Sequence, residues 1–280
     1  MVQKPSIQVI EDIEAVPVEE QNIVFKPNVG PQTDFLAAGE REVLYGGSAG
    51  GGKSYAMLAD PLRYMGHPSF SGLLLRHTTE ELRELIYKSK EIYPQIWKGI
   101  KWSERKMQWE APSGARLWMS YLDRDDDVLR YQGLAFSWIG FDELTQWSTP
   151  YAWNYMRSRL RSVAQDLPVY MRATTNPGGP GHQWVKKMFI DPAPYGKQFN
   201  ATDIESGNVL SYPKGHTKSG QPLFKRRFIP ARLSDNPYLS AQGDYETMLL
   251  SLPEHQRKQL LDGDWDIKEG AAFSEFDRNI

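Results

Sequence analysis

The glycine-rich stretch at residues 41–54, REVLYGGSAGGGKS, constrains the fold more than any other part of the sequence. Gly47, Gly52, Lys53 and Ser54 fit the pattern G-x-x-x-x-G-K-[ST]. The residues before Gly47 predict a short buried strand, and Lys53 opens a predicted helix. Glycines let successive backbone amides turn around a phosphate, and the helix N-terminus adds partial positive charge. The pattern therefore predicts a phosphate-binding loop (P-loop); the alternative is a flexible glycine-rich linker.

The ligand expected at this loop is ATP with Mg²⁺. We expect Lys53 to reach the β- and γ-phosphates and to take part in catalysis, and the Ser54 hydroxyl to ligate Mg²⁺. The residues of the loop that are expected to bind the nucleotide are Gly47, Ser48, Ala49, Gly50, Gly51, Gly52, Lys53 and Ser54.

An apolar run that ends in two carboxylates supplies the partner that a P-loop needs. Residues 136–141, FSWIGF, predict a strand, and Asp142 and Glu143 follow it directly. This is the form of a Walker B strand. We expect Asp142 to hold the Mg²⁺ ion and Glu143 to polarise the attacking water as a general base.

Two further polar sites are weaker signals. Gln32 precedes the P-loop, and an amide that donates and accepts can pair with the edge of adenine; the alternative is an ordinary helix-capping residue. Residues 169–174 predict a strand, after which Thr175 and Asn176 can hydrogen-bond the γ-phosphate or the attacking water. The alternative is that the Asn-Pro-Gly-Gly sequence is only a turn, and both interpretations can hold.

The order of the predicted elements indicates an α/β fold. Residues 72–77 predict a buried strand, and residues 79–93 predict a helix that Thr78 or Thr79 can cap. Residues 105–122 predict a β-hairpin in which Trp109 and Trp118 belong to the core. Together with the P-loop helix, which Pro61 should kink or end, this predicts a mainly parallel sheet flanked by helices. We expect a P-loop NTPase of the additional-strand type with a small C-terminal lid.

Composition narrows the class of protein. The chain has 280 residues and a net charge of −2, so no global basic field indicates nucleic acid, although a motor can carry its positive charge locally. It has no cysteine, which excludes disulfides and cysteine-ligated zinc. We find no signal-peptide pattern and no membrane-length apolar run, so we expect a soluble intracellular protein without a membrane partner. Residues 1–22 are predicted to be a mobile acidic arm.

These motifs resemble one family, the large subunits of tailed-phage terminases, which are ATP-driven DNA-packaging motors. The resemblance covers nearly all of residues 25–280. The segments that carry it are PNVGPQTDFL, REVLYGGSAGGGKS, GLLLRHT, YQGLAFSWIGFDELT, TTNPGGPGH, FIPARLSDNPYL and LLDGDW. The P-loop and Walker B strand alone fit many ATPases, whereas their combination with TTNPGGPGH and the last two segments is much more specific.

The resemblance implies roles for individual residues and a division of the chain. Thr175 and Asn176 would lie in the family's coupling motif, and Gln32 in its adenine motif. Residues 23–226 would be the ATPase core and 227–267 a lid that links hydrolysis to movement. Residues 268–280 would begin a nuclease domain that this chain lacks, so we expect no nuclease activity.

The resemblance also implies partners. These are double-stranded DNA, the portal protein, the small terminase subunit and further copies of the chain in a ring, commonly a pentamer, although the isolated chain could be a monomer. The expected location is the host cell cytoplasm. Basic groups expected to contact DNA phosphates are Lys186, Lys187, Lys225, Arg226 and Arg227; the alternative for each one is a solvated surface charge.

An arginine finger is expected as well, because P-loop motors often need one to neutralise charge on the γ-phosphate. Arg130 precedes the Walker B strand, and we predict that it acts on the site of a neighbouring subunit. The alternates are Arg157, Arg159 and Arg161. The competing interpretation is that Arg130 forms a local ion pair with Asp125, Asp126 or Asp127.

The function predicted from the sequence is Mg²⁺-assisted ATP hydrolysis that drives translocation of double-stranded DNA. One alternative is another P-loop translocase or a helicase-like ATPase, which normally needs a second motor domain or further motifs. The other is a nucleotide-gated binding module without turnover, against which Glu143 argues.

Overall fold

The computed structural model describes residues 24–241 and 243–267. Two predictions, the acidic arm at 1–22 and the start of a nuclease domain at 268–280, lie outside these residues.

The described residues form one nine-stranded sheet in the order β3-β4-β5-β2-β6-β7-β1-β9-β8. The six central strands run parallel to one another, and short antiparallel strands close both margins. The central strands are β5 (Arg116–Tyr121), β2 (Ser71–Arg76), β6 (Trp138–Phe141), β7 (Tyr170–Thr175), β1 (Glu42–Gly47) and β9 (Lys225–Ala231). The marginal strands are β3 (Lys101–Ser103), β4 (Gln108–Glu110) and β8 (Gln198–Asn200).

Strand β7 lies between β1, which carries the P-loop, and β6, which carries Asp142 and Glu143. This extra strand is the mark of the additional-strand class, so the predicted fold class is confirmed. The predicted hairpin is confirmed too: β4 and β5 are antiparallel, and the buried Trp109 pairs across the strands with Leu117.

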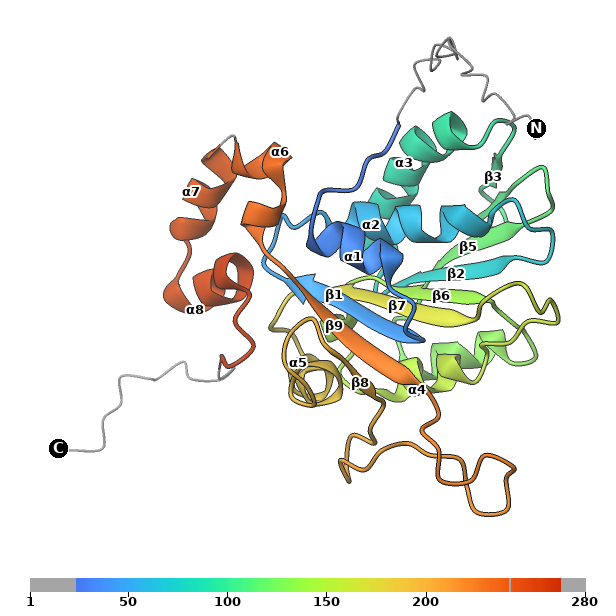
Figure 1. The fold of residues 1–280 in the computed structure, drawn as a ribbon. Helices are drawn as coiled ribbons and strands as arrows, with labels where there is room; N and C mark the ends of the chain where they lie inside the picture. Colours follow the sequence, from blue (N-terminus) through green and yellow to red (C-terminus); the bar gives the residue numbers. More distant parts are fainter. Residues whose placement is uncertain (1–23, 242, 268–280) are drawn as a thin grey trace, which may run out of the picture.

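Helices cover both faces of the sheet (Figure 1). One face carries α1 (Pro31–Ala37), α2 (Lys53–Ala59), the 3₁₀ turn η1 (Asp60–Tyr64) and α3 (Thr79–Ile96). The other carries the 3₁₀ turns η2 (Asp125–Tyr131) and η3 (Leu144–Gln146), α4 (Tyr151–Arg157), α5 (His182–Val185) and the π-helical turn η4 (Lys186–Ile190). Each face has its own cluster of buried apolar side chains.

Local sequence fixes the helix ends on the P-loop side of the sheet. Helix α3 begins with a capping box, in which Thr78 Oγ1 accepts from the Glu81 amide at 3.3 Å and the Glu81 carboxylate accepts from the Thr78 amide at 3.4 Å. Helix α2 ends at Ala59, and the chain tightens into η1 at Pro61, as predicted, because proline cannot continue the helical hydrogen bonds.

A buried ion cluster ties the start of β1 to β9 and α4. The carboxylate of Glu42 is fully buried, its Oε2 lies 2.7 Å from Arg226 Nε, and its Oε1 contacts Arg157 Nε. Burial raises the pKa of Glu42, but the two arginines outweigh burial and the net pKa is lowered. Arg226 is therefore not the DNA contact that the sequence predicted, since it is 1% exposed and neutralises Glu42.

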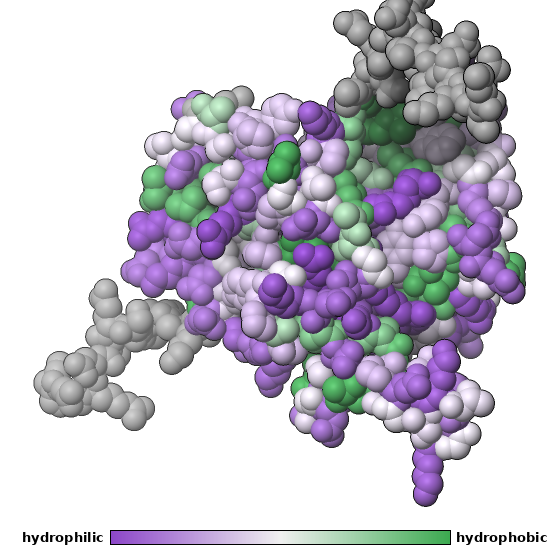
Figure 2. All heavy atoms as spheres, in the orientation of Figure 1, coloured by the Kyte–Doolittle hydropathy of each residue, from purple (hydrophilic) through white to green (hydrophobic). Residues whose placement is uncertain are grey.

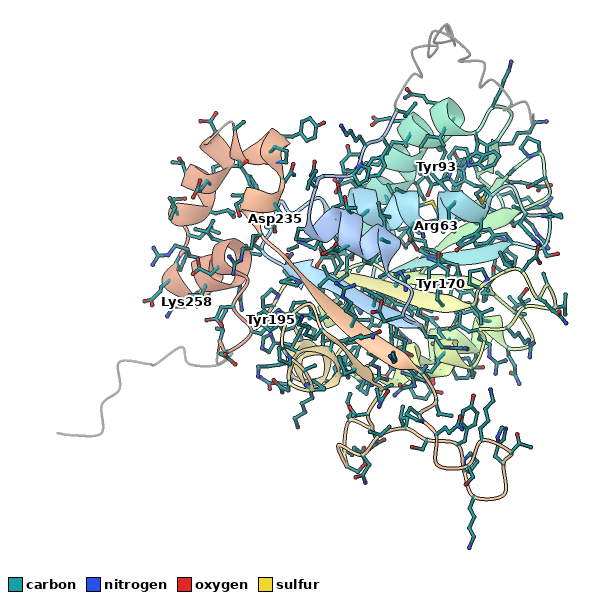
Figure 3. All side chains as sticks on the ribbon, viewed as in Figure 1. Arg63, Tyr93, Tyr170, Tyr195, Asp235 and Lys258 are labelled. Carbon is teal, nitrogen blue, oxygen red and sulfur yellow. The ribbon has the colours of Figure 1, made fainter. Side chains whose placement is uncertain are left out.

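A second buried polar cluster joins the end of α2 to the sheet. Trp138 Nε1 donates to Asp60 Oδ2 at 2.8 Å, and Arg63 Nη2 lies 2.7 Å from Asp60 Oδ1. Arg172 of β7 stacks over the Tyr170 ring, with 4.2 Å between guanidinium carbon and ring centroid, and donates to the Glu40 carbonyl at 3.0 Å. Figure 3 labels Arg63 and Tyr170 in this region. Each charged group here has an opposite charge or carbonyl partner, as buried charges require.

The C-terminal helices stand beside the carboxyl end of β1 (Figure 1). We refer to residues 233–262 as the lid segment. It consists of η5 (Leu233–Asp235), α6 (Pro237–Ser240), α7 (Asp244–Leu250), α8 (Glu254–Arg257) and the π-helical turn η6 (Lys258–Asp262). The boundary predicted between residues 226 and 227 falls inside β9, which pairs with β1 along nearly its whole length. Residues 227–231 therefore belong to the sheet.

Figure 2 shows hydrophilic residues over most of the face viewed, with apolar residues in small separate groups. None of the helices within residues 24–241 and 243–267 is both long and apolar enough to cross a bilayer.

Candidate nucleotide-binding site

The predicted site residues meet at one edge of the sheet, because the carboxyl ends of parallel strands share an edge. The P-loop follows β1. Thr175 is the last residue of β7 and Asn176 comes directly after it. Asp142 and Glu143 follow β6. Strand β2 brings Arg76 to the same edge, which sequence reasoning missed.

The P-loop is curled around its own lysine. Lys53 is 6% exposed, and its Nζ donates to the Ser48 carbonyl at 2.6 Å. Burial lowers the pKa of Lys53, while the carboxylates of Glu143 and Asp142 act in the opposite direction. The amine is therefore held on the inner side of the loop and close to the two carboxylates.

Two of the predicted phosphate-binding amides are used within the protein. The Ser48 amide donates to the Ala231 carbonyl at 2.8 Å, and the Ala49 amide donates to the Leu260 carbonyl at 2.6 Å. These contacts pack the start of the P-loop against β9 and η6. The glycine-rich part of the loop, Gly50 to Gly52, is the part that lines a cavity with Lys53 and Ser54.

Asp142 sits in a buried setting suited to a metal-binding carboxylate. Its Oδ1 accepts from the Thr174 hydroxyl, and its Oδ2 lies 3.1 Å from Arg76 Nε, at an angle that makes an ion pair without a hydrogen bond. Within the described residues Oδ2 accepts no hydrogen bond and has Arg76 as its charged partner, so a cation or its water would share this oxygen with Arg76. The other predicted Mg²⁺ ligand is the hydroxyl group of Ser54, at the start of α2.

Asp142 and Ser54 carry oxygen groups of the kind that bind Mg²⁺. Within the part of the chain that the structure describes, no three His, Cys, Asp or Glu side chains gather as a metal site. Mg²⁺ commonly takes one or two protein oxygens and completes its shell with phosphate oxygens and water. One carboxylate and one hydroxyl are enough for that arrangement.

Glu143 combines an unusual backbone with an unusual environment. Its φ and ψ are 61° and 57°, in the left-handed region that glutamate rarely adopts. Burial raises the pKa of its carboxyl group and Asp142 raises it further, while Lys53, Arg76 and the Asn176 backbone amide lower it; the net direction is upward. A carboxyl group with a raised pKa is a better proton acceptor near neutral pH.

Thr175 and Asn176 are at the site edge but differ in what their side chains do. Thr175 Oγ1 lies 2.7 Å from Thr145 Oγ1 and accepts from the Thr145 amide at 3.1 Å, so this hydroxyl anchors η3. Asn176 Oδ1 is buried without a hydrogen-bond partner among the described residues. Thr174 was missed in the sequence, and it is the threonine that contacts Asp142.

Gln32 lies against the P-loop in a cavity of about 530 Å³ that also reaches Phe25, Lys88 and Tyr238. Its Nε2 donates to the Gly52 carbonyl at 2.9 Å, and its Oε1 accepts from the Asn28 amide at 2.6 Å. Both ends of the amide therefore have protein partners, so contact with a base stays a prediction.

Arg130 adopts the competing arrangement that the sequence allowed. Its Nη2 lies 3.4 Å from Asp127 Oδ1, and it donates to the Tyr121 carbonyl at the end of β5 at 2.8 Å. The side chain is 46% exposed at the rim of the sheet, so a role in a neighbouring site stays a prediction. Arg157 is engaged with Glu42, which removes it as an alternate finger.

The turn that follows Asn176 is held in place by His182 and Trp265. His182 Nδ1 accepts from the Gly178 amide at 2.8 Å, and its ring stacks on Trp265 with 5.2 Å between centroids. The imidazole thus joins the predicted coupling motif to the LLDGDW segment, as a structural residue.

Comparison with known proteins assigns the family. Residues 44–280 match the family model described as terminase large subunit, T4likevirus-type, N-terminal. The chain belongs to the terminase large subunit family. The resemblance seen in the sequence is therefore confirmed. A comparison with curated proteins finds no match.

Solved terminases have the same fold. The large terminase of a thermophilic bacteriophage, solved in complex with ADP, is 18% identical, with a TM-score of 0.61, over 90% of this chain and 57% of that one. The ATPase domain of the Thermus phage P74-26 large terminase is 13% identical, with a TM-score of 0.53, over 86% of this chain and 94% of that one. This terminase chain thus spans little more than half of the first of these two proteins.

Proposed function

We propose that this chain is the ATPase motor domain of a viral DNA-packaging terminase. The observation that carries the proposal is the meeting of Lys53, Asp142 and Glu143 at one sheet edge, with β7 as the additional strand between the P-loop and the two carboxylates. The solved relative from a thermophilic bacteriophage is described in complex with ADP, which supports a nucleotide as the ligand.

In the proposed mechanism the chain's own residues bind the phosphates, orient the attacking water and remove its proton. Lys53 neutralises the β- and γ-phosphates, and the P-loop amides bind their oxygens. Ser54 and Asp142 would hold Mg²⁺, which supplies charge neutralisation on the transferred phosphoryl group. Glu143 accepts the proton of the attacking water, helped by its raised pKa. Asn176 Oδ1, which is buried without a hydrogen-bond partner among the described residues, is proposed to accept from that water and orient it.

The proposed output is movement of double-stranded DNA into a procapsid in the host cytoplasm. The proposed partners are the portal protein, the small terminase subunit and other copies of the chain in a ring, commonly a pentamer. Exposed lysines such as Lys187 and Lys225 remain for phosphate contact, so duplex binding should be independent of sequence and fall steeply with salt. A helicase-like motor would instead separate strands, which a strand-displacement assay detects.

The experiment that tests this function is ATP binding and steady-state hydrolysis, with and without duplex DNA. Lys53→Ala should lose nucleotide binding, while Glu143→Gln should bind ATP and lose turnover by roughly 10² or more, as expected for a general base. Lys98→Ala, at an exposed lysine, is the matched control. Near-normal hydrolysis by Lys53→Ala would contradict the proposal, and wild-type binding without turnover would favour a nucleotide-gated binding module.

A further inference from the structure

Three successive P-loop carbonyls are each held by a side chain from a different segment. Asn236 Nδ2 donates to the Gly50 carbonyl at 2.6 Å, and the Tyr45 hydroxyl donates to the Gly51 carbonyl at 2.7 Å. Gln32 donates to the Gly52 carbonyl at 2.9 Å. The donors come from the lid segment, from β1 and from α1.

These hydrogen bonds set the direction of the amides that follow. A peptide unit is planar and trans, so a carbonyl fixed on one side places the next N–H on the opposite side. The three bonds therefore orient the amides of Gly51, Gly52 and Lys53. Gly50 and Gly52 have φ values of 77° and 75°, which let the chain alternate in this way and form an anion-binding concavity.

Asn236 differs from the other two donors because it belongs to the lid segment. Its side chain is 8% exposed, and its Oδ1 accepts from the Tyr238 amide at 3.2 Å, which caps α6. One amide group thus joins the first helix of the lid segment to the P-loop. Apolar contact accompanies it, since a Cβ added at Gly50 would lie 2.7 Å from Leu233 Cδ1 and 3.2 Å from Leu239 Cδ1.

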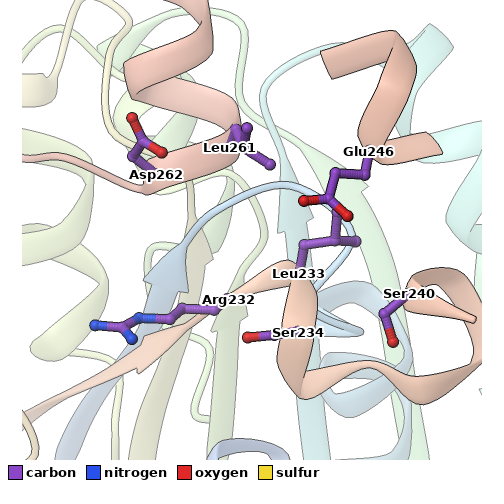
Figure 4. Close-up of a pocket in the computed structure, with 7 residues that line it drawn as sticks. All are labelled: Arg232, Leu233, Ser234, Ser240, Glu246, Leu261 and Asp262. Atoms are coloured by element: carbon purple, nitrogen blue, oxygen red, sulfur yellow. The ribbon is translucent and has the colours of Figure 1, made fainter. Parts of the chain in front are cut away.

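A pocket also lies at the base of the lid segment. A cavity of about 350 Å³ lies among Arg232, Leu233 and Ser234 after β9, Ser240 and Glu246 near α6 and α7, and Leu261 and Asp262 of η6. Figure 4 shows these side chains around it. The lid segment therefore reaches the P-loop through separate contacts, at Gly50 through the Asn236 side chain and at Ala49 through the Leu260 carbonyl.

We propose that Asn236 is a positioning residue for nucleotide binding: through the Gly50 carbonyl it makes the phosphate-binding shape of the P-loop depend on a docked lid segment. The inference rests on the proposed ATPase function. Tyr45 and Gln32 hold their carbonyls from the core, so docking of the lid completes the set. The amides are then oriented before the phosphates arrive, which strengthens binding without a new contact to the ligand.

The test separates the P-loop contact from the helix cap. Asn236→Ser keeps an oxygen that can cap α6 but has no group that reaches Gly50. We expect the Kd for ADP and the KM for ATP to rise roughly five- to tenfold, the effect of one lost hydrogen bond, with kcat within about twofold. The melting temperature without nucleotide should stay close to wild type. The matched control is Asn208→Ser, at an exposed asparagine between β8 and β9.

A second variant keeps the test valid if Asn236→Ser fails to fold. Asn236→Asp keeps the volume and the cap, yet places an acceptor against the Gly50 carbonyl, so nucleotide binding should weaken further than in Asn236→Ser. Unchanged nucleotide affinity in both variants, or a drop in melting temperature that accounts for the lost binding, would overturn the inference. A wild-type chain that binds no nucleotide would instead overturn the proposed function, so the two failures are distinguishable.

Discussion

The carboxyl group of Glu143 lies among charges of both signs, and their balance governs when it can accept a proton. Burial and Asp142 raise its pKa, whereas Lys53 and Arg76 lower it. A general base works only when deprotonated, so turnover should rise with pH through the pKa of this group. Arg76 moderates that pKa from the end of β2.

Replacing Arg76 by glutamine should therefore change the pH profile of hydrolysis. Loss of its positive charge raises the pKa of Glu143, so the acid limb of kcat should move to higher pH. The loss of activity should be greatest in acid and shrink as pH rises. The measurement is kcat against pH for wild type, Arg76→Gln and the control Arg83→Gln, whose arginine is exposed on α3. A loss that is the same at every pH would mean that Arg76 does not act through Glu143.

At the scale of elements, Glu42 holds β1, β9 and α4 together through two arginines. The sequence alone does not reveal this pairing, because Arg226 lies in the charged run Lys225–Arg227 and its partner Glu42 is 184 positions away. Removing one member of a buried ion pair leaves the other uncompensated, which is more damaging than losing the pair.

Glu42→Gln should lower the free energy of unfolding at neutral pH by about 3 kcal/mol, the low end for a broken buried pair because the amide still accepts a hydrogen bond. The pKa of Glu42 is lowered in the folded state, so its stabilisation is present above the unfolded pKa and is lost as pH falls through the folded one. The difference between wild type and variant should therefore shrink in acid.

Urea unfolding at several pH values measures this effect. Glu110→Gln, at an exposed position of β4, is the control and should change stability by no more than about 0.5 kcal/mol. A neutral-pH difference as small as that of the control would show that Glu42 does not stabilise the junction of the three elements.

The sequence predicted the elements whose signals are local. The glycine pattern located the P-loop, the run ending in Asp142 located the Walker B strand, and the strand before Thr175 supplied the additional strand. Contacts between distant segments were not predictable in this way. Arg76 and Thr174 gain their roles only because β2, β6 and β7 are neighbours in the sheet. Arg226 was interpreted as exposed because a single sequence does not reveal its buried partner.

At the scale of the whole molecule, the position of Arg130 matters only if copies of the chain assemble. It belongs to η2, and its side chain reaches the last carbonyl of β5, a strand that β2, β6 and β7 separate from β1. Its ion pair with Asp127 is partly exposed and therefore weak, so a stronger anion on a neighbouring subunit can displace it.

A mixing experiment tests this assembly. Arg130→Ala subunits should bind ATP and hydrolyse little alone, because the neighbouring arginine is missing. Mixed with Lys53→Ala subunits they should regain activity, since each Lys53→Ala subunit offers its arginine to an intact site next to it. The control pair uses Arg105→Ala, at an exposed arginine, which should be active alone. A mixture that assembles and stays inactive would refute the shared site, as would full activity of Arg130→Ala in the assembled state.

The left-handed backbone of Glu143 affects how the chain would respond to artificial selection. A glutamate in this region costs the folded state about 1–2 kcal/mol, and burying its carboxyl group adds to the cost. Asparagine takes these backbone angles more readily and carries no charge. A variant library screened for heat resistance alone would therefore accumulate Glu143→Asn and lose turnover. Directed evolution of a more heat-resistant motor would have to select for ATP hydrolysis in every round.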